Sequence, residues 1–216
     1  NHYIKHVIGS VGTEVPNVEI QIRDPHGNPL EQGQEGEICV RGPNIMKGYF
    51  SRPEETVKVL RNGWLYSGDI GRVDEDGYLF IVDRIKDIYK NSKGQTVAPG
   101  AIEQKLAHVP GITRSFLVGD GREYNVLLIV PDLEDPVLSE GPESDQVAEY
   151  FQQVVSTANQ GLAPYERVVN FALLDRDFDS ERDELTPKGS FRRRVIEKNF
   201  RATIEALYGA SFRALK

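Results

Sequence analysis

Short alternations of apolar and polar residues fill the first third of the chain. Residues 18–22 alternate in this way, a Pro- and Gly-containing turn sequence follows at 24–29, and residues 37–41 repeat the alternation. A period of two predicts half-buried strands, and the turn between two such runs predicts a hairpin. Further strands are expected at 70–74 and 78–83, on either side of an acidic glycine turn. This third is predicted to form a β-rich, barrel-like unit.

The pattern changes after Arg84. Apolar residues at helical spacing and short β-rich runs predict helices at 99–109, 145–158, 190–199 and 201–208, and strands at 113–118, 126–130 and 168–174. The order helix, strand, strand, helix, strand, helix is typical of a small α+β domain. The expected fold class is therefore α+β, with a β-rich unit at 1–83 followed by an α+β domain at 84–216.

Composition limits the function classes. The net charge of −7 argues against a nucleic-acid-binding surface, which normally needs a basic footprint. No apolar run reaches the roughly 20 residues of a membrane span, and the N-terminus lacks the layout of a signal peptide, so any membrane association is expected to be peripheral. The single cysteine, Cys39, allows no internal disulfide and is compatible with a reducing cytoplasm. The four histidines show no metal-ligand clustering.

Residues 66–84 carry the most informative chemistry. Asp69 follows Gly68, which lets the backbone turn and predicts that the carboxylate stands at a strand end. A second acid, Asp83, precedes Arg84. A carboxylate can accept hydrogen bonds from the two vicinal hydroxyls of a ribose, and an Arg can pair with phosphate. The pattern indicates a nucleotide site, although a turn acid and a surface ion pair are the plainer alternatives.

The same stretch resembles the adenylate-forming superfamily of acyl-CoA synthetases, luciferases and peptide-synthetase adenylation domains. The similar motifs follow one another in order along nearly the whole chain: Gly36-Glu37-Ile38-Cys39-Val40-Arg41-Gly42, Met46-Lys47-Gly48-Tyr49, Tyr66-Ser67-Gly68-Asp69, Gly77 to Arg84, Val97-Ala98-Pro99 and Leu185-Thr186-Pro187. The spacing from Asp83 to Pro99 and the Leu-Thr-Pro sequence look most like long-chain fatty acid–CoA ligases.

The resemblance implies a reaction and its partners. A carboxylic acid, expected to be a fatty acid, reacts with ATP to give an acyl-adenylate and pyrophosphate, and the acyl group then forms a thioester with CoA. ATP and AMP, Mg²⁺ and CoA are thus the implied cofactors and substrates. Mg²⁺ would accompany the ATP phosphates and be held mainly outside this chain, so no metal ligand is assigned here.

The resemblance also implies that the chain is the C-terminal portion of a longer enzyme. The family's Ser-, Thr- and Gly-rich phosphate loop and its aromatic-Gly-x-Thr-Glu segment do not occur in these 216 residues. Residues 1–83 would then be the C-terminal β-rich subdomain of the large adenylation domain, whose other part lies upstream in the same polypeptide. Residues 84–216 would be the mobile C-terminal domain. The isolated chain is predicted to be inactive.

Individual roles come from the matching positions. Asp69 matches the residue that holds the ribose hydroxyls, and Arg84 matches one that contacts the nucleotide. Asp83 and Lys86 match the hinge about which the C-terminal domain rotates between the two half-reactions. Gly94 lies in a loop that, in the family, lines the channel for the pantetheine arm of CoA, although a solvated hairpin is the plainer interpretation.

The last motif departs from the family pattern. Ser190 stands where the family has a lysine that stabilises charge on the α-phosphate, and Lys188 lies two residues earlier. Lys188 either takes over this role or is an ordinary solvated lysine. The following run, Arg192 to Arg194, is expected to be a charged helix face, with contact to the 3′-phosphate of CoA as the alternative.

Two further functions remain open on the sequence. A relative with the same first half-reaction could deliver the acyl group to a carrier protein or keep the adenylate. The chain could also act alone as a noncatalytic binding module.

Overall fold

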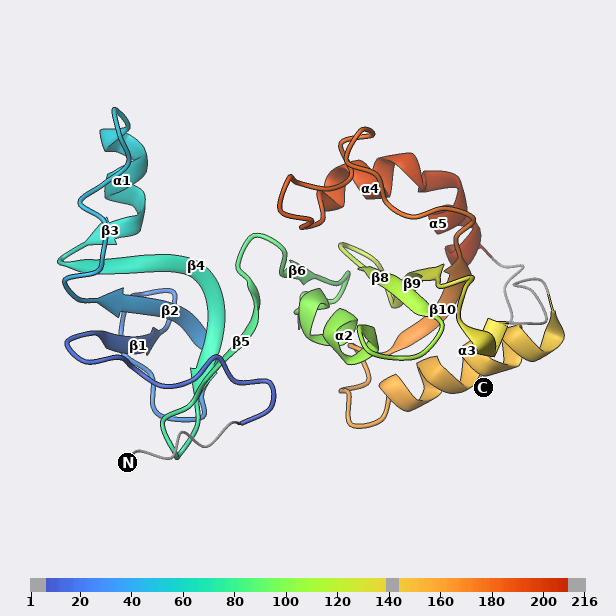
Figure 1. Cartoon of the computed structure of the whole chain (residues 1–216), viewed down its shortest axis with the longest axis horizontal. Coiled ribbons are helices and arrows are strands. Elements are labelled where there is room, and N and C mark those ends of the chain that lie inside the picture. The colour runs from blue at the N-terminus through green and yellow to red at the C-terminus, as the bar shows by residue number, and fades with distance from the viewer. Residues whose placement is uncertain (1–6, 139–143, 210–216) are drawn as a thin grey trace. The chain divides into compact units, whose positions relative to one another are not determined.

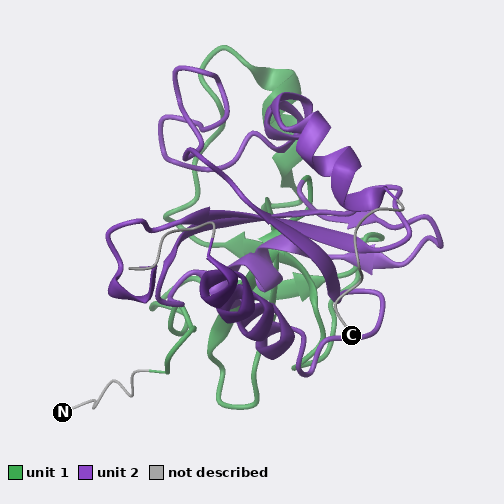
Figure 2. Cartoon of the chain, turned by 90° about the vertical axis from the view of Figure 1, so that its right-hand side faces the viewer, with its two compact units in different colours: residues 1–86 green, residues 87–216 purple. Residues whose placement is uncertain are grey.

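The computed structural model describes residues 7–138 and 144–209. Contacts divide the chain into two compact units, residues 1–86 and 87–216 (Figure 2). Every sheet formed by the described residues lies within one unit. Each unit also has buried apolar residues of its own.

The first unit is a curled antiparallel sheet (Figure 1). Its elements are β1 (Glu19–Arg23), β2 (Gly36–Arg41), α1 (Pro53–Val59), β3 (Leu60–Arg61), β4 (Trp64–Val73) and β5 (Leu79–Arg84). The strands run in the order β1-β2-β4-β3, and β5 also pairs with β4. The long strand β4 bends strongly, so the sheet curls around a small core of Ile22, Ile38 and Leu79. The strand predicted at 70–74 is only the second half of β4, which begins at Trp64.

The second unit is a three-stranded sheet covered by helices on both faces (Figure 1). Its elements are β6 (Tyr89–Lys90), β7 (Thr96–Val97), α2 (Pro99–Leu106), β8 (Ile112–Val118), β9 (Asn125–Pro131), η1 (Pro136–Leu138), α3 (Asp145–Ala158), β10 (Val168–Leu173), α4 (Arg193–Asn199) and α5 (Arg201–Tyr208). Strand β9 is central, antiparallel to β8 and parallel to β10. The short strands β6 and β7 form a separate hairpin.

Alternate residues of the central strands supply two separate cores. Leu117, Leu127 and Ile129 face α2 and α3, whereas their neighbours in the chain face α4 and α5. Because both faces are covered, every residue of β9 is buried, and its sequence is continuously apolar after Asn125. Burying each large apolar side chain contributes roughly 1.5–3 kcal/mol. These two cores therefore hold the unit together.

The α+β fold class predicted from the sequence is confirmed. From Pro99 on, the main helices and strands follow one another in the predicted order, but the short strands β6 and β7 precede them. Two helix boundaries are wrong. The helix predicted at 99–109 ends at Leu106. The helix predicted from residue 190 begins at Arg193, because Leu185 and Phe191 pair as a short antiparallel bridge and the chain between them forms a hairpin. Within the described residues, no helix has the length and apolar character needed to cross a bilayer.

Candidate functional site

Asp69 lies in a bulge within β4, and its predicted position at a strand end is wrong. Tyr66 and Ile70 pair with β2 residues that are only two apart, so residues 67–69 oppose a single residue of β2. Gly68 adopts a φ of +76°, which favours glycine. Its N–H donates to Oε1 of Glu37 at 3.0 Å. The glycine therefore turns the backbone as expected, but it does so inside a longer strand, where a bulge redirects the next side chain.

Asp69 and Arg84 are brought together across β4 and β5. The two residues are register partners, and Oδ1 of Asp69 lies 3.2 Å from Nε of Arg84. The Asp69 side chain is 30% exposed and that of Arg84 is 55% exposed, so the pair faces solvent. Oδ1 of Asp83 accepts a hydrogen bond from the backbone N–H of Arg84 at 2.7 Å. The arrangement presents a carboxylate and a guanidinium side by side on an accessible surface.

The exposed position of this ion pair bears on its role. A solvent-exposed pair contributes only about 0–1 kcal/mol to stability. The fold therefore gains little from placing opposite charges at a bulge. Lys86, which matches the hinge, is exposed two residues after Arg84 and is the last residue of the first unit.

Gly94 occupies the tip of the β6–β7 hairpin. Its φ is +78°, and no atom lies within 4 Å of the position where a Cβ would stand. The turn is closed by Asn91, whose Oδ1 accepts the N–H groups of Lys93 at 3.0 Å and Gln95 at 2.9 Å. Gly94 therefore provides an open, side-chain-free surface at a well-ordered turn.

The base of this hairpin is anchored in the second unit. The Tyr89 hydroxyl donates to Oδ1 of the fully buried Asn125 at 2.8 Å. Burial raises the pKa of Tyr89, so its phenol stays protonated as a donor. A Cβ on Gly119 would stand 2.1 Å from Oδ1 of Asn125, so only glycine leaves room for this contact. These contacts fix where the Gly94 turn projects.

Lys188 lies at the tip of a second hairpin. The N–H of Thr186 donates to the carbonyl of Ser190 at 2.8 Å, and the N–H of Gly189 donates to the carbonyl of Thr186 at 2.8 Å. Gly189 has a φ of +79°, as expected for a tight hairpin closed by a type I turn. Lys188 is exposed, and it forms no ion pair within the described part of the chain. Its ammonium is free to meet an anionic ligand.

The sequence predicts that Arg192 to Arg194 form one charged helix face, and this prediction is wrong. Arg193 is largely buried and lies 2.9 Å from Oε1 of Glu103, with its guanidinium 4.3 Å from the ring centroid of Phe116. Burial opposes its charge, but Glu103 more than offsets this, so the pKa of Arg193 is raised. Arg192 pairs with Asp183 at 2.6 Å. Arg194 is exposed, as Arg192 is, and it lines a small surface groove.

Two further observations concern Cys39 and the residue types that bind metals. Cys39 is fully buried in β2, and burial raises the pKa of its thiol to about 11, so the cysteine is a core residue. Among the described residues, no three His, Cys, Asp or Glu side chains gather so that they could hold a metal ion.

Sequence reasoning missed the acids that hold the site residues in place. Glu37 was read only as the polar position of an alternating strand, although its carboxylate holds the bulge beside Asp69. Glu103, in α2, pairs with Arg193 across 90 residues. No local pattern reveals a partner so far away in the sequence, whereas the position of Glu37 inside a family motif was an available signal.

Two family models match the chain. The model described as AMP-binding enzyme matches residues 2–50, and the model described as AMP-binding enzyme C-terminal domain matches residues 86–211, more than half of the chain. The chain belongs to the AMP-binding enzyme family. The resemblance seen in the motifs is confirmed, and with it the membership among adenylate-forming acyl-CoA ligases.

Curated relatives of this chain include acid–CoA ligases. The chain is 33% identical to the long-chain-fatty-acid–CoA ligase FadD15 of Mycobacterium tuberculosis, with 93% of this chain and 34% of that protein covered. It is 42% identical to a feruloyl-CoA synthase of an Amycolatopsis species, with 54% of this chain and 24% of that protein covered. The chain thus spans about a third or less of the length of these relatives.

A solved structure shows the same fold with a bound nucleotide. The A-PCP didomain of a carboxylic acid reductase from Segniliparus rugosus, in complex with AMP, is 25% identical with a TM-score of 0.73. The comparison covers 90% of this chain and 28% of the reductase chain. That reductase didomain therefore binds AMP on a fold similar to this one.

Proposed function

We propose that the chain is part of an enzyme that joins a carboxylic acid to CoA through an acyl-adenylate. A carboxylate oxygen attacks the α-phosphorus of ATP, the bond to the β-phosphate oxygen breaks, and pyrophosphate leaves with its electron pair. The CoA thiolate then attacks the acyl carbon and AMP leaves, so no oxidant or reductant is needed. The observation that carries the proposal is the Asp69–Arg84 pair, an exposed carboxylate and guanidinium built on a bulge.

Asp69 is proposed to hold the ribose. A carboxylate can accept a hydrogen bond from each of two vicinal hydroxyls, and no hydrogen bond to Oδ2 of Asp69 is found among the described residues. Arg84 keeps the carboxylate oriented and brings a positive charge to the nucleotide side. Because the ribose is present in both ATP and the adenylate, the pair would serve both half-reactions.

Lys188 and Gly94 are proposed to serve one half-reaction each. The Lys188 ammonium would stabilise charge on the α-phosphate during adenylation, in place of the lysine that Ser190 replaces. The open turn at Gly94 would let the pantetheine arm of CoA pass close to the backbone. Asp83 and Lys86 would form the hinge, since the two compact units divide directly after Lys86.

The acid is proposed to be a long-chain fatty acid. Support comes from the similarity to FadD15 over 93% of the chain, whereas the feruloyl-CoA synthase match covers 54%. Mg²⁺ would accompany ATP and be held by residues outside this chain. The second candidate function, transfer of the acyl group to a carrier protein, is supported by the similarity to the A-PCP didomain.

The test uses the complete enzyme with a panel of acids and acceptors. Acid-dependent exchange of pyrophosphate into ATP reports adenylation, and thioester formation with CoA or with a phosphopantetheinylated carrier protein reports the second step. We expect pyrophosphate exchange with long-chain fatty acids, of about 12 carbons or more, and faster acyl transfer to CoA than to the carrier protein. If none of the acids supports pyrophosphate exchange, the proposed enzyme function is rejected. Acyl transfer to the carrier protein alone would favour the second candidate function.

A further inference from the structure

Glu184, at the base of the Lys188 hairpin, is a fully buried carboxylate. Its side chain is 0% exposed, whereas the neighbouring Asp183 side chain is 63% exposed. A buried charge is costly unless it is paired and its lone pairs are satisfied. Its contacts are therefore the reason that it can be tolerated there.

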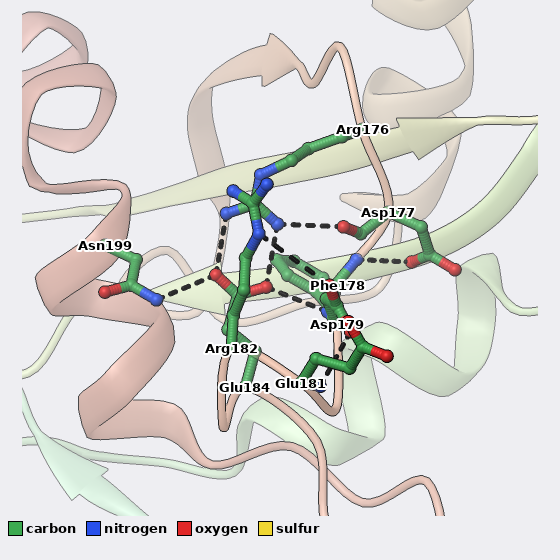
Figure 3. Close-up of polar contacts among 8 residues, drawn as sticks. All are labelled: Arg176, Asp177, Phe178, Asp179, Glu181, Arg182, Glu184 and Asn199. Carbon is green, nitrogen blue, oxygen red and sulfur yellow. Dashed lines mark hydrogen bonds and ion pairs between the residues drawn. The ribbon is translucent and has the colours of Figure 1, made fainter.

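Four hydrogen bonds converge on this carboxylate (Figure 3). Oε1 accepts from Arg176 Nη2 at 2.7 Å and from Asn199 Nδ2 at 2.9 Å, and Oε2 accepts from Arg176 Nη1 at 2.8 Å and from the N–H of Asp179 at 2.9 Å. The Arg176 guanidinium binds in the bidentate manner and also lies 4.4 Å from the ring centroid of Phe200. Both carboxylate oxygens are thereby saturated.

The donors come from segments on either side of the hairpin. Arg176 and Asp179 lie in the loop after β10, and Asn199 is the last residue of α4. The backbone carbonyl of Glu184 also accepts the N–H of Arg192 at 2.8 Å, which joins the two arms of the hairpin. Glu184 thus fixes the hairpin base through both its side chain and its backbone.

The second arm is held by aromatic packing. Phe191 lies edge-on to Phe116 at 5.3 Å and to Phe178 at 5.4 Å between ring centroids. Lys188 itself has no such anchor at the exposed tip. Its position therefore depends on how firmly the base is held.

We propose that Glu184 is a positioning residue for Lys188, which it holds by locking the hairpin base to the loop after β10 and to α4. This inference rests on the proposed role of Lys188 in adenylation. A group that stabilises developing charge is effective only if it is already in place, since the cost of ordering it is otherwise paid during the reaction. Glu184 is fully buried, so in this proposal it acts through the hairpin and not by contact with substrate.

The chain offers an internal reference for hairpin mobility. Both hairpins carry an exposed Lys-Gly at the turn, Lys93-Gly94 and Lys188-Gly189, and trypsin cleaves after lysine. Limited proteolysis of the complete enzyme, with fragments identified by mass spectrometry, compares the two cleavage rates in one sample. Local loosening raises cleavage after Lys188 alone, whereas general destabilisation raises both.

The test variant is Glu184→Gln, which keeps the size of the side chain and removes its charge. We expect cleavage after Lys188 to rise about tenfold relative to cleavage after Lys93. Adenylation should slow about 10- to 100-fold in kcat with an unchanged KM for ATP. Glu181→Gln is the matched control, since it changes a nearby, exposed acid in the same way, and it should leave both readouts at wild-type values. Asn199→Ala, which removes one of the four hydrogen bonds, is the milder variant if Glu184→Gln does not fold.

A double mutant separates positioning from general damage. In a Lys188→Ala background, Glu184→Gln should slow adenylation no further, because its effect passes through Lys188. Additive losses, equal increases in cleavage at both lysines, or unchanged cleavage after Lys188 would each overturn the proposal. If Lys188→Ala alone adenylates at the wild-type rate, the proposed role of Lys188 fails, and the cleavage ratio still decides whether Glu184 anchors the hairpin.

Discussion

Asp69 and Arg84 face each other across β4 and β5, with 3.2 Å between the carboxylate oxygen and the guanidinium nitrogen. The pair stands where a glycine bulge redirects the strand. Because the pair adds little stability, it is available for the nucleotide contact proposed above.

Replacing Asp69 with Ala in the complete enzyme should weaken both half-reactions. The loss of hydrogen bonds to a charged group costs about 1.5–3 kcal/mol, or roughly 10- to 100-fold in rate. Pyrophosphate exchange and thioester formation from preformed acyl-adenylate are the two assays. Glu75→Ala, in the exposed turn between β4 and β5, is the control and should behave as wild type. Wild-type rates in both assays would remove the ribose assignment.

The chain of 216 residues should have no adenylating activity by itself. It lacks the phosphate loop and the adenine-framing segment expected from the family, so it cannot supply their positioning and charge stabilisation. The measurement is acid-dependent pyrophosphate exchange with the purified chain, and the complete enzyme serves as the positive control. Exchange above background would contradict the prediction.

Sequence patterns predicted the elements well but placed the site residues less well. The covered sheet of the second unit follows from apolar runs such as β9, because burial on both faces leaves a signal in every residue. The bulge at Asp69 depends on register with β2, and a single glycine does not reveal register. The sequence predicts an exposed position for Arg193, because no local pattern reveals that its partner, Glu103, lies 90 residues away. Pairing over such distances is set by the tertiary fold.

Gly94→Ala should slow thioester formation and leave adenylation near the wild-type rate. The added Cβ meets no atom of the described chain, but it stands where the pantetheine arm is proposed to pass. An alanine held at the φ of +78° that Gly94 adopts carries about 1–2 kcal/mol of local strain, which glycine does not. Gly121→Ala is a matched control, since that glycine also has a positive φ of +65° and open space. Equal slowing by both variants would attribute the effect to strain alone.

Stability should fall as the pH is lowered through the range in which Glu184 titrates. Hydrogen bonds from Arg176, opposed by burial and aided by Asn199, lower the pKa of Glu184 from 4.5 to about 2. A carboxyl with a depressed folded pKa stabilises the chain above its unfolded pKa, and this stability is lost between about pH 4.5 and pH 2. The linked contribution at neutral pH is about 3 kcal/mol.

Urea unfolding of the 216-residue chain from pH 7 to pH 3 measures this dependence. Glu184→Gln should be less stable at pH 7 and should lose less further stability on acidification, because it no longer has the titrating group. Glu181→Gln, at an exposed acid nearby, should keep the wild-type dependence of stability on pH. A Glu184→Gln chain with the same pH slope as wild type would show that other carboxyls account for the acid sensitivity.

Lys188→Ala in the complete enzyme should slow adenylation about 10²- to 10³-fold, the scale of removing one preorganised charge-stabilising group. Thioester formation from preformed adenylate should stay nearly intact, because the lysine is proposed to act in only one half-reaction. Lys198→Ala, in α4, is the control. Rapid-quench measurement of acyl-adenylate against thioester separates the two steps.

Ser190→Lys tests whether Lys188 already supplies the charge, because it restores a lysine at the position where the family has one. Ser190 lies directly beside the turn, where its N–H donates to the Thr186 hydroxyl at 3.1 Å and its carbonyl accepts the N–H of Thr186. If Lys188 already supplies the charge, Ser190→Lys should be neutral or modestly harmful. Restored adenylation in Lys188→Ala/Ser190→Lys would show that either position can deliver the ammonium. If Lys188→Ala has no effect, Arg192 becomes the next candidate, because Arg193 is committed to Glu103 whereas Arg192 pairs only with the exposed Asp183 among the described ion pairs.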